Sequence, residues 1–335
     1  MSRKLLEVED LTLVYDMREG PAKVFRNLNF HIDSQEMVGL VGESGCGKTS
    51  LAYAILRLLP RNARFVTGRI TFDGQSLLDK TESEMRKVRG SRISMVFQDP
   101  MTSLNPVFTV EQQMAKVIEI HSGLTHSDAR KKVAKTLRQV ELADVDRVMK
   151  AYPHELSGGM QQRVMIGMAL SLDTELIIAD EPTTAVDATI QMQIMKLLTT
   201  LKKEVGFSVL LITHNLGLVS NICDRIAVMY AGDIVEDGNA SAVVKSPKHP
   251  YTAALLSATP TVSSSGGARV ALASIEGSAP DFLAVPSGCP FHPRCTYRMD
   301  VCTSVVPRRL QLDETHFASC HLNDRSQNIA NAPLS

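Results

Sequence analysis

Gly42-Glu43-Ser44-Gly45-Cys46-Gly47-Lys48-Thr49 is the stretch that decides the fold. It fits the pattern G-x-x-x-x-G-K-[ST], in which glycines allow a tight turn and aim backbone N–H groups at phosphate oxygens. An apolar run, residues 37–41, precedes it, and a stretch with helical spacing, residues 49–59, follows it. Strand, loop and helix in this order predict a phosphate-binding loop, with Lys48 on the β- and γ-phosphates and the Thr49 hydroxyl on Mg²⁺.

A second candidate site lies at the end of another apolar run, residues 176–179, which is followed by Asp180 and Glu181. A strand end holds a carboxylate rigidly, so Asp180 is expected on the metal side of a phosphoryl-transfer site. Glu181 points differently and is expected to polarise the attacking water. The alternative is an ordinary strand end with solvated acids.

Short apolar runs alternate with helical patterns over the first 245 residues or so. Residues 93–97 and 209–213 are typical of strands, and roughly residues 110–172 are dominated by helical patterns. Between residues 190 and 205 the apolar side chains recur at helical spacing. Strands that alternate with helices predict an α/β fold with a mostly parallel sheet covered by helices.

The composition changes after residue 245, where Ser246-Pro247-Lys248-His249-Pro250 should break any regular element. We therefore expect a domain at 1–245 and an extension at 246–335. The extension carries four of the six cysteines, namely Cys289, Cys295, Cys302 and Cys320. Because a chain in a reducing compartment seldom uses cysteines for disulfides, this cluster suggests a small metal-stapled unit.

Composition also bears on location and partners. Lys+Arg and Asp+Glu both number 36, and this balance argues, weakly, against a nucleic-acid partner bound through a basic surface. The apolar runs are shorter than a bilayer span, and residues 1–7 lack the apolar stretch of a signal peptide. We expect the chain to stay in the cytoplasm and to reach a membrane only through a partner.

A resemblance to a known family rests on Leu156-Ser157-Gly158-Gly159-Met160-Gln161-Gln162-Arg163. This segment resembles the signature motif of ABC-transporter ATPases, and it lies shortly before the acidic strand, as in that family. The resemblance implies an ABC-type P-loop ATPase domain: a mostly parallel sheet core, an antiparallel β part and a helical subdomain at about 100–172. It also implies that Ser157, Gly158, Gly159 and Gln161 close over ATP held by an opposing subunit.

The same resemblance implies further roles. Tyr15 resembles the aromatic residue that stacks on adenine, although a buried strand tyrosine is the alternative. Gln98 resembles the glutamine that touches Mg²⁺ and the water, and His214 resembles the switch histidine at the γ-phosphate. The implied catalytic residues are Glu181, His214, Gln98 and Lys48. The implied ATP and Mg²⁺ site consists of Tyr15, Gly42, Glu43, Ser44, Gly45, Cys46, Gly47, Lys48, Thr49, Ser50, Gln98 and Asp180, with Thr49, Gln98 and Asp180 as the Mg²⁺ ligands.

The cysteine spacing C-x5-C-x6-C-x17-C contains none of the tight pairs usual in zinc sites. Four cysteines on a proline-rich scaffold suit a 4Fe-4S cluster, whereas zinc, with His292, His316 or His321 as further ligands, or free or disulfide-bonded thiols remain alternatives. Residues 288–302 and 248–252 resemble the C-terminal extension of dipeptide/oligopeptide transporter ATPases, which is associated with an iron–sulfur cluster.

Taken together, the resemblance implies ATP hydrolysis coupled to uptake of a peptide-like solute at the cytoplasmic face of the inner membrane. The implied partners are a second ABC ATPase subunit, two membrane-spanning permease subunits and an extracytoplasmic solute-binding protein, with no nucleic acid. Two rivals stay open: a soluble ABC ATPase of DNA repair or translation, and a metal-sensing regulator. The sequence leaves the transported solute open.

Overall fold

The computed structural model describes residues 3–184, 186–258 and 275–324. The chain forms two compact units, and neither is continuous in sequence. The helical unit comprises Met1–Arg3, Asp33–Glu36 and Asp79–Leu211. The phosphate-loop unit comprises Lys4–Ile32, Met37–Leu78 and Ile212–Ser335. The expected domain boundary near residue 245 stays a prediction.

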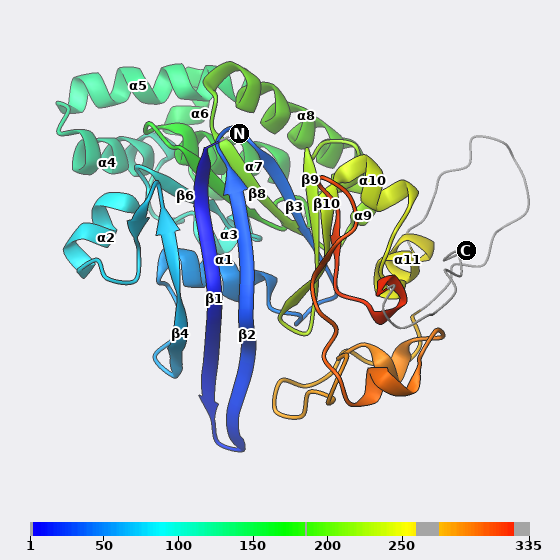
Figure 1. Ribbon diagram of the computed structural model, residues 1–335. Coiled ribbons are helices and arrows are strands. Elements are labelled where there is room, and N and C mark those ends of the chain that lie inside the picture. The colour runs from blue at the N-terminus through cyan, green and yellow to red at the C-terminus, as the bar shows by residue number, and fades with distance from the viewer. Residues whose placement is uncertain (1–2, 185, 259–274, 325–335) are drawn as a thin grey trace, which may run out of the picture. The chain divides into compact units, whose positions relative to one another are not determined.

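The phosphate-loop unit contains an antiparallel sheet with the strand order β2-β1-β4-β5. Its strands are β1 (Lys4–Met17), β2 (Gly20–Asp33), β4 (Ala63–Phe72) and β5 (Gln75–Ser76). β1 and β2 are the two long neighbouring strands of Figure 1, and β1 pairs with β4 from Leu6↔Phe72 to Tyr15↔Ala63. The apolar pattern of the sequence predicts a strand only at residues 11–15 of β1. Pairing on both sides extends the strand into more polar residues at each end.

A second group of strands in this unit has the order β11-β12-β10-β9-β3. β3 (Met37–Val41) pairs in parallel with β9 (Arg225–Tyr230), and β9 forms a hairpin with β10 (Asp233–Asn239). β10 then pairs with the short β12 (Phe317–Ala318), and β12 with β11 (Leu310–Gln311). The C-terminal part of the chain therefore adds two strands to the sheet whose β3 leads into the phosphate loop.

The helices of the phosphate-loop unit are short. They are α1 (Lys48–Leu56), α9 (Leu216–Ser220), α10 (Ala240–Lys245) and α11 (Pro250–Ser257), with 3₁₀ turns at His292–Arg294, Asp300–Thr303 and His321–Asn323. α10 ends at Lys245 and α11 begins at Pro250, so the residues between them break regular structure as expected. α1 ends earlier than the predicted helix because Arg57 adopts a left-handed conformation (φ 51°) that closes it.

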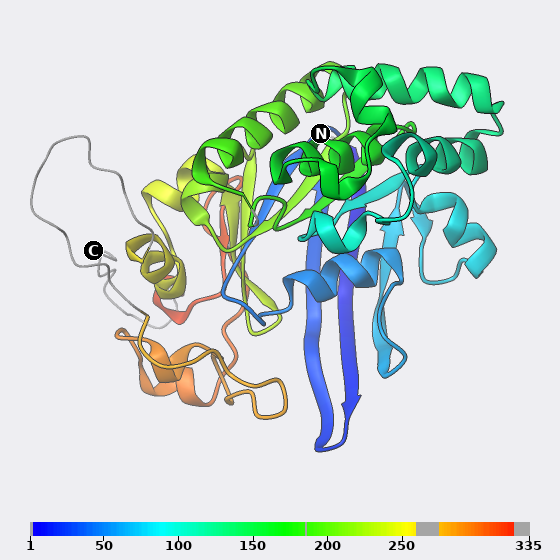
Figure 2. The same cartoon turned by 180° about the vertical axis from the view of Figure 1, so that it is seen from behind.

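The helical unit holds the parallel pair β6 (Ile93–Val96) and β7 (Leu176–Asp180), followed in strand order by β8 (Ser208–Thr213), whose last two residues belong to the other unit. Its helices, seen from the other side in Figure 2, are α2 (Glu82–Val88), α3 (Pro100–Ser103), α4 (Val110–Ser122), α5 (His126–Gln139), α6 (Val145–Lys150), α7 (Gly158–Leu170) and α8 (Ala188–Val205), with a 3₁₀ turn at Pro153–Glu155. The expected predominance of helix between residues 100 and 172 is confirmed. Parallel and antiparallel strand pairs together make the fold a mixed α/β architecture.

Packing in this helical region follows helix periodicity. α5 buries Ala129, Val133 and Leu137 on one face, and the helix begins at the N-cap Thr125. Gly167 of α7 lies where an added Cβ would come within 3.5 Å of Thr136 and Val140, so α5 and α7 pack closely. Among the residues that the structure describes, each helix is too short or too polar to cross a bilayer.

Candidate nucleotide-binding site

The phosphate loop has the backbone that its glycines predict. Gly45 and Gly47 adopt left-handed conformations with φ of 79° and 112°, which other residues adopt only with strain. Gly47 is the N-cap of α1, so the loop ends at a helix N-terminus. A Cβ at Gly42 would lie 2.3 Å from the Met229 carbonyl oxygen, so this position requires glycine. Backbone N–H groups at such a terminus suit a phosphate group.

Lys48 is buried, with 5% of its surface exposed, and its ammonium reaches back to carbonyl groups of the phosphate loop. Nζ donates hydrogen bonds to the carbonyl oxygens of Gly42 and Glu43, both at 2.8 Å, and lies 3.7 Å from Cys46 Sγ. A buried ammonium must be compensated in this way. Burial raises the pKa of the Cys46 thiol, against the opposing effect of Lys48, so Cys46 acts as a small packed side chain.

Two more predicted residues lie beside the loop. The Tyr15 hydroxyl donates to Ser50 Oγ at 3.3 Å, which places this half-buried tyrosine of β1 next to the start of α1. The side chain of Thr49 is exposed at the first turn of α1, where a metal-ligating hydroxyl is expected. Ser44 and Gly45 are also exposed, and His214 is exposed just after β8.

In the helical unit, Gln98 and Glu181 come together. The parallel register pairs Val96 of β6 with Ala179 of β7, and Gln98 and Glu181 each follow by two residues. Gln98 Nε2 donates to Glu181 Oε2 at 3.2 Å, and Thr184 Oγ1 donates to the same oxygen at 2.9 Å. Two side chains predicted to serve the same water molecule are thus neighbours.

The two acids at the end of β7 differ in backbone and burial. Asp180 is buried at the strand end, whereas Glu181 adopts a left-handed conformation with φ of 44°. Left-handed backbone is strained for a residue other than glycine, and such strain concentrates at functional sites. The change of backbone between the two residues turns the Glu181 carboxylate away from the course of the strand.

The signature segment starts α7. Ser157 is its N-cap, and its Oγ accepts a hydrogen bond from the Met160 N–H at 3.4 Å. Gln161 is buried, and its Nε2 donates to the carbonyl oxygens of Pro153 at 2.8 Å and Leu156 at 3.2 Å. Ser157 and Gly158 are exposed, and a Cβ at Gly159 would lie 2.8 Å from Ile190 Cγ2. The segment therefore presents an exposed helix N-terminus.

The structure also shows two loop contacts that the sequence did not predict. The Glu43 N–H donates to the Tyr251 hydroxyl at 2.8 Å, and the Glu43 carboxylate accepts hydrogen bonds from Arg294 at 2.7 and 2.9 Å. Tyr251 belongs to a segment noted only for its resemblance to peptide-transporter ATPases. Arg294 follows no local pattern, and its position next to Cys295 was the available signal.

The four C-terminal cysteines, all free thiols, line one small cavity, together with His249, His292 and His321. Burial raises the pKa of Cys289 to about 11 and that of Cys320 to about 12, and the neighbouring thiols add to both shifts. Within residues 3–184, 186–258 and 275–324, no three Cys, His, Asp or Glu side chains are placed to hold a metal ion. The metal-stapled unit expected from the sequence is thus not confirmed.

The candidate zinc histidines have other partners. His316 Nε2 is 2.8 Å from Glu236 Oε1, His321 Nε2 is 2.9 Å from the Val305 carbonyl oxygen, and His292 Nδ1 is 3.0 Å from the Cys289 carbonyl oxygen. A zinc site that used these nitrogens would have to break the corresponding hydrogen bonds.

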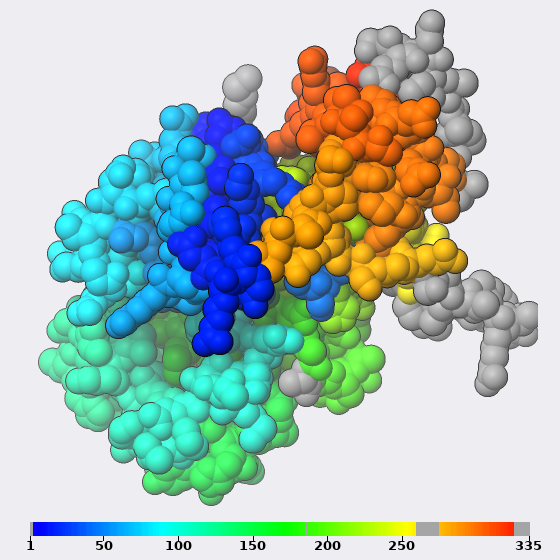
Figure 3. Space-filling model, turned by 90° about the horizontal axis from the view of Figure 1, so that it is seen from below, coloured from blue at the N-terminus to red at the C-terminus, as the bar shows by residue number. Residues whose placement is uncertain are grey.

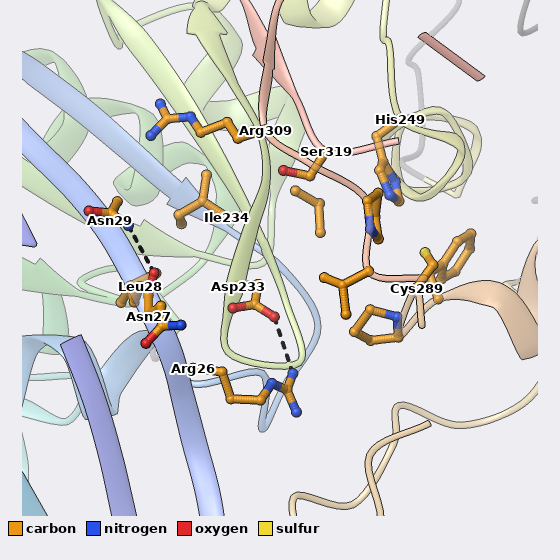
Figure 4. A pocket seen from close by; sticks show the side chains of 15 residues that line it. Arg26, Asn27, Leu28, Asn29, Asp233, Ile234, His249, Cys289, Arg309 and Ser319 are labelled. Atoms are coloured by element: carbon orange, nitrogen blue, oxygen red, sulfur yellow. Dashed lines mark hydrogen bonds and ion pairs between the residues drawn. The ribbon is translucent and has the colours of Figure 1, made fainter. Parts of the chain in front are cut away.

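A larger cavity of the phosphate-loop unit adjoins the cysteine cavity and shares His249 and Cys289 with it (Figure 4). Arg26 pairs with Asp233 at 3.2 Å on one side of it, and His249, Cys289 and Arg309 line other parts. Figure 3 shows orange residues of the C-terminal part next to blue residues of the N-terminal part. Since none of the predicted nucleotide residues lines this cavity, it is not the nucleotide site.

A phosphate loop with this sequence and this backbone places the chain in the class of P-loop nucleotide-binding proteins. Residues 25–184 match the family described as ABC transporter, and residues 235–302 match the oligopeptide/dipeptide transporter C-terminal region. The chain belongs to the family of ABC transporter ATP-binding proteins, which are ATPases.

Curated relatives align over nearly the whole chain. The probable peptide ABC transporter ATP-binding protein y4tR of Sinorhizobium fredii is 45% identical over 326 residues, covering 97% of each chain. The oligopeptide transport ATP-binding protein OppD of Salmonella typhimurium is 45% identical and covers 90% of this chain and 89% of its own. The dipeptide transport ATP-binding protein DppD of Bacillus subtilis is 41% identical, covering 96% of each.

Among solved structures, the ATP-binding cassette MJ0796, in a dimeric post-hydrolysis state bound to ADP and Pi, superposes with a TM-score of 0.63. It is 28% identical in sequence and covers 70% of this chain and 99% of its own. The ABC-type P-loop fold expected from the signature motif is thus confirmed.

Proposed function

We propose that this chain hydrolyses ATP to power the uptake of peptides, or of a related solute, through an ABC importer. The observation that carries the proposal is the presence on one chain of the ABC transporter family and the oligopeptide/dipeptide C-terminal region. The relatives that align with nearly the whole chain carry dipeptide or oligopeptide transport in their names. The reaction converts ATP and water into ADP and phosphate.

The phosphate loop binds and neutralises the nucleotide's phosphates in this proposal. Two carbonyl oxygens hold Lys48 at the loop, and this supports a role for its charge at the β- and γ-phosphates. Thr49, Asp180 and Gln98 are the side chains that would hold Mg²⁺, and their oxygen atoms are the ligands this ion prefers. Bound Mg²⁺ would offset charge on the transferred phosphoryl group. Tyr15 would stack on the adenine.

Glu181 and Gln98 are proposed to orient the attacking water. The hydrogen bond from Gln98 Nε2 fixes one carboxylate oxygen of Glu181, and a carboxylate so held can accept a proton from water. His214, at the end of β8, is proposed to contact the γ-phosphate. Most of the rate enhancement in such a site comes from positioning and charge stabilisation.

The signature segment is proposed to serve a partner's nucleotide. Ser157, Gly158 and Gly159 present an exposed helix N-terminus, and Gln161 fixes the turn before it. A second, homologous ATPase subunit would therefore supply the opposite half of each ATP site. Two permease subunits and an extracytoplasmic solute-binding protein complete the proposed assembly, with this chain bound peripherally at the cytoplasmic face of the membrane.

For the extension we propose a 4Fe-4S cluster on Cys289, Cys295, Cys302 and Cys320. Supporting this, all four thiols are free and line one cavity. A cubane cluster is larger than a single ion, so its thiolates stand farther apart than the ligands of one zinc ion. Anaerobic purification with iron, sulfide and zinc assays and a visible spectrum tests this. We expect brown absorbance and about four irons per chain. Stoichiometric zinc without that absorbance would overturn it.

Co-purification tests the transport role. The tagged chain, expressed in its native cells and extracted in detergent, should retain a second ATPase and two integral membrane proteins. ATP hydrolysis by this assembly should rise when a peptide-loaded solute-binding protein is added. Recovery with ribosomes or DNA-repair proteins, and none with membrane proteins, would favour the rival class.

A further inference from the structure

The second residue of the phosphate loop is held from far along the chain. Glu43 Oε2 accepts a hydrogen bond from Arg294 Nη1 at 2.7 Å, and Oε1 accepts one from Nη2 at 2.9 Å. This is a bidentate pair between residues 251 positions apart, both within the phosphate-loop unit. Paired hydrogen bonds between a guanidinium and a carboxylate fix orientation as well as distance.

Arg294 is buried and held by further contacts beside the Glu43 pair. Only 5% of its side chain is exposed, against 28% for Glu43. Nε donates to the Glu276 carbonyl oxygen at 2.8 Å, and the guanidinium carbon lies 5.9 Å from the Tyr230 ring centroid and 6.0 Å from that of Phe291. The guanidinium is therefore held before any nucleotide binds.

The backbone of Glu43 is held as well. Its N–H donates to the Tyr251 hydroxyl at 2.8 Å, and the Tyr251 ring packs against Tyr230 at 4.6 Å and Phe291 at 5.3 Å between centroids. Tyr251, Phe291 and Arg294 all belong to the C-terminal part of the chain. One residue of the loop is thus held at its side chain and at its N–H by that part.

These contacts continue to the lysine of the site. The Glu43 carbonyl oxygen accepts one of the two 2.8 Å hydrogen bonds that hold Lys48 Nζ across the loop. A shift of Glu43 would therefore move an acceptor that sets the position of the Lys48 ammonium. The structure shows a continuous path from Arg294 through Glu43 to Lys48.

We propose that Arg294 is a positioning residue for ATP hydrolysis, acting through Glu43 to hold the phosphate loop and Lys48 in the nucleotide-binding arrangement. Arg294 touches neither nucleotide nor metal in this proposal. The inference rests on the phosphate loop being the ATP site, and it does not depend on which solute is transported. It gives the C-terminal extension an indirect role in nucleotide binding, through Glu43 and Lys48.

Arg294→Ala, Arg294→Lys and Glu43→Gln, measured in the full chain with its co-purified partners, test the proposal. For Arg294→Ala we expect the KM for ATP to rise about tenfold, with a smaller fall in kcat, because the loop binds ground-state phosphates. The KM of Arg294→Lys should lie between those of Arg294→Ala and wild type. The lysine ammonium keeps the positive charge but cannot form the paired hydrogen bonds of a guanidinium. Arg298→Ala, which removes an exposed arginine of the same segment, is the matched control.

The pair also predicts non-additivity. The KM for ATP of the double variant Glu43→Gln/Arg294→Ala should be no higher than that of Arg294→Ala alone, because both substitutions break the same Arg294–Glu43 contact. Metal content and melting temperature, measured for every variant, separate this effect from loss of the extension's fold. If Arg294→Ala does not fold, Arg294→Lys and Glu43→Gln still give the KM comparison.

Three results would overturn the proposal. The first is a folded Arg294→Ala protein with the same KM and kcat as Arg298→Ala. The second is a double variant in which the two effects multiply, because Arg294 and Glu43 would then act independently. The third is a wild-type chain that neither binds nor hydrolyses ATP, which would overturn the ATPase assignment as well. A wild type that hydrolyses ATP without responding to peptide would contradict only the transport role.

Discussion

The phosphate loop and the signature segment both begin a helix, and both are proposed to face phosphate, yet different parts of the chain hold them. The loop depends on remote partners: Tyr251 lies 208 residues from Glu43, and Arg294 lies 251 residues away. The signature segment depends on near ones. Ser157 caps α7 through a residue three positions on, and Gln161 bonds to carbonyl groups five and eight positions back.

The difference shows what each site needs in order to be in place. The hydrogen bonds of Ser157 and Gln161 that shape the signature turn come from α7 and the residues just before it, although Gly159 also packs against Ile190 of α8. The phosphate loop, by contrast, has contacts to the C-terminal extension at Glu43, and our proposal is that it depends on them. Damage to the extension should therefore weaken ATP binding at the chain's own loop, while damage at Ser157 should weaken only what the chain does for its partner.

Ser157→Arg gives the largest expected effect. A bulky cation in place of the exposed hydroxyl should block closure over the partner's nucleotide, and we expect ATP turnover by the assembly to fall about a hundredfold or more. ATP binding to the isolated chain should be unchanged. Thr125→Arg, which removes the N-cap of α5 in the same unit, is the control for the lost cap. Weak ATP binding by the isolated Ser157→Arg chain would contradict the claim that the signature segment does not affect the chain's own phosphate loop.

Tyr251→Phe tests whether the phosphate loop depends on its remote contact with Tyr251, and its expected effect is smaller. It removes the hydroxyl that accepts the Glu43 N–H and keeps the buried ring. We expect a loss of about 1 kcal/mol in the free energy of unfolding and a rise of a few-fold in the KM for ATP. Tyr152→Phe alters an exposed tyrosine of the helical unit and should change neither. Identical kinetics for the two variants would mean that the Tyr251 contact does not matter to the loop.

His249→Asn tests the same region through the pH dependence of stability. His249 Nδ1 accepts a hydrogen bond from the Tyr251 backbone N–H at 3.0 Å, the His249 backbone N–H donates to Glu236 Oε2 at 2.9 Å, and burial lowers the pKa of the imidazole to about 3. Below about pH 6.5 the unfolded chain binds a proton that the folded chain does not. Stability should thus fall as pH drops from about 6.5 toward 3, by at most about 1.4 kcal/mol per pH unit.

Asparagine at position 249 keeps an N-cap acceptor and does not titrate. Urea unfolding at pH 5, 6 and 7 gives the free energy of unfolding at each pH. Its slope against pH should be smaller in His249→Asn than in wild type, by the equivalent of about one bound proton. Equal slopes would show that His249 does not remain neutral in the folded chain.

Several parts of this fold were predictable because their signals are local. The phosphate loop consists of eight adjacent residues that together fit a known motif. β3, β6 and β7 are buried, mostly apolar runs. β2 was missed, although Leu28, Phe30 and Ile32 alternate with more exposed residues along its second half. The polar residues and the proline near its start hide a strand whose length comes from pairing with β1.

Other parts depend on contacts that no local pattern encodes. Gln98 and Glu181 could be named separately from the resemblance, but their hydrogen bond follows from the register of β6 with β7. Glu43 filled a variable position of the loop motif, and Arg294 lay among the cysteines. Only the folded chain brings these two residues together, since 250 residues separate them and neither lies in a periodic element.

Glu181→Gln tests the ATPase mechanism most directly. The amide keeps the size of the side chain and a hydrogen-bonding oxygen, but it cannot accept a proton from the attacking water. Bound nucleotide and released phosphate would be measured in the assembly, with Glu204→Gln, an acid on α8, as the control. We expect Glu181→Gln to retain ATP and release almost no phosphate, while the control matches wild type. Phosphate release by Glu181→Gln at near wild-type rates would contradict the role of Glu181.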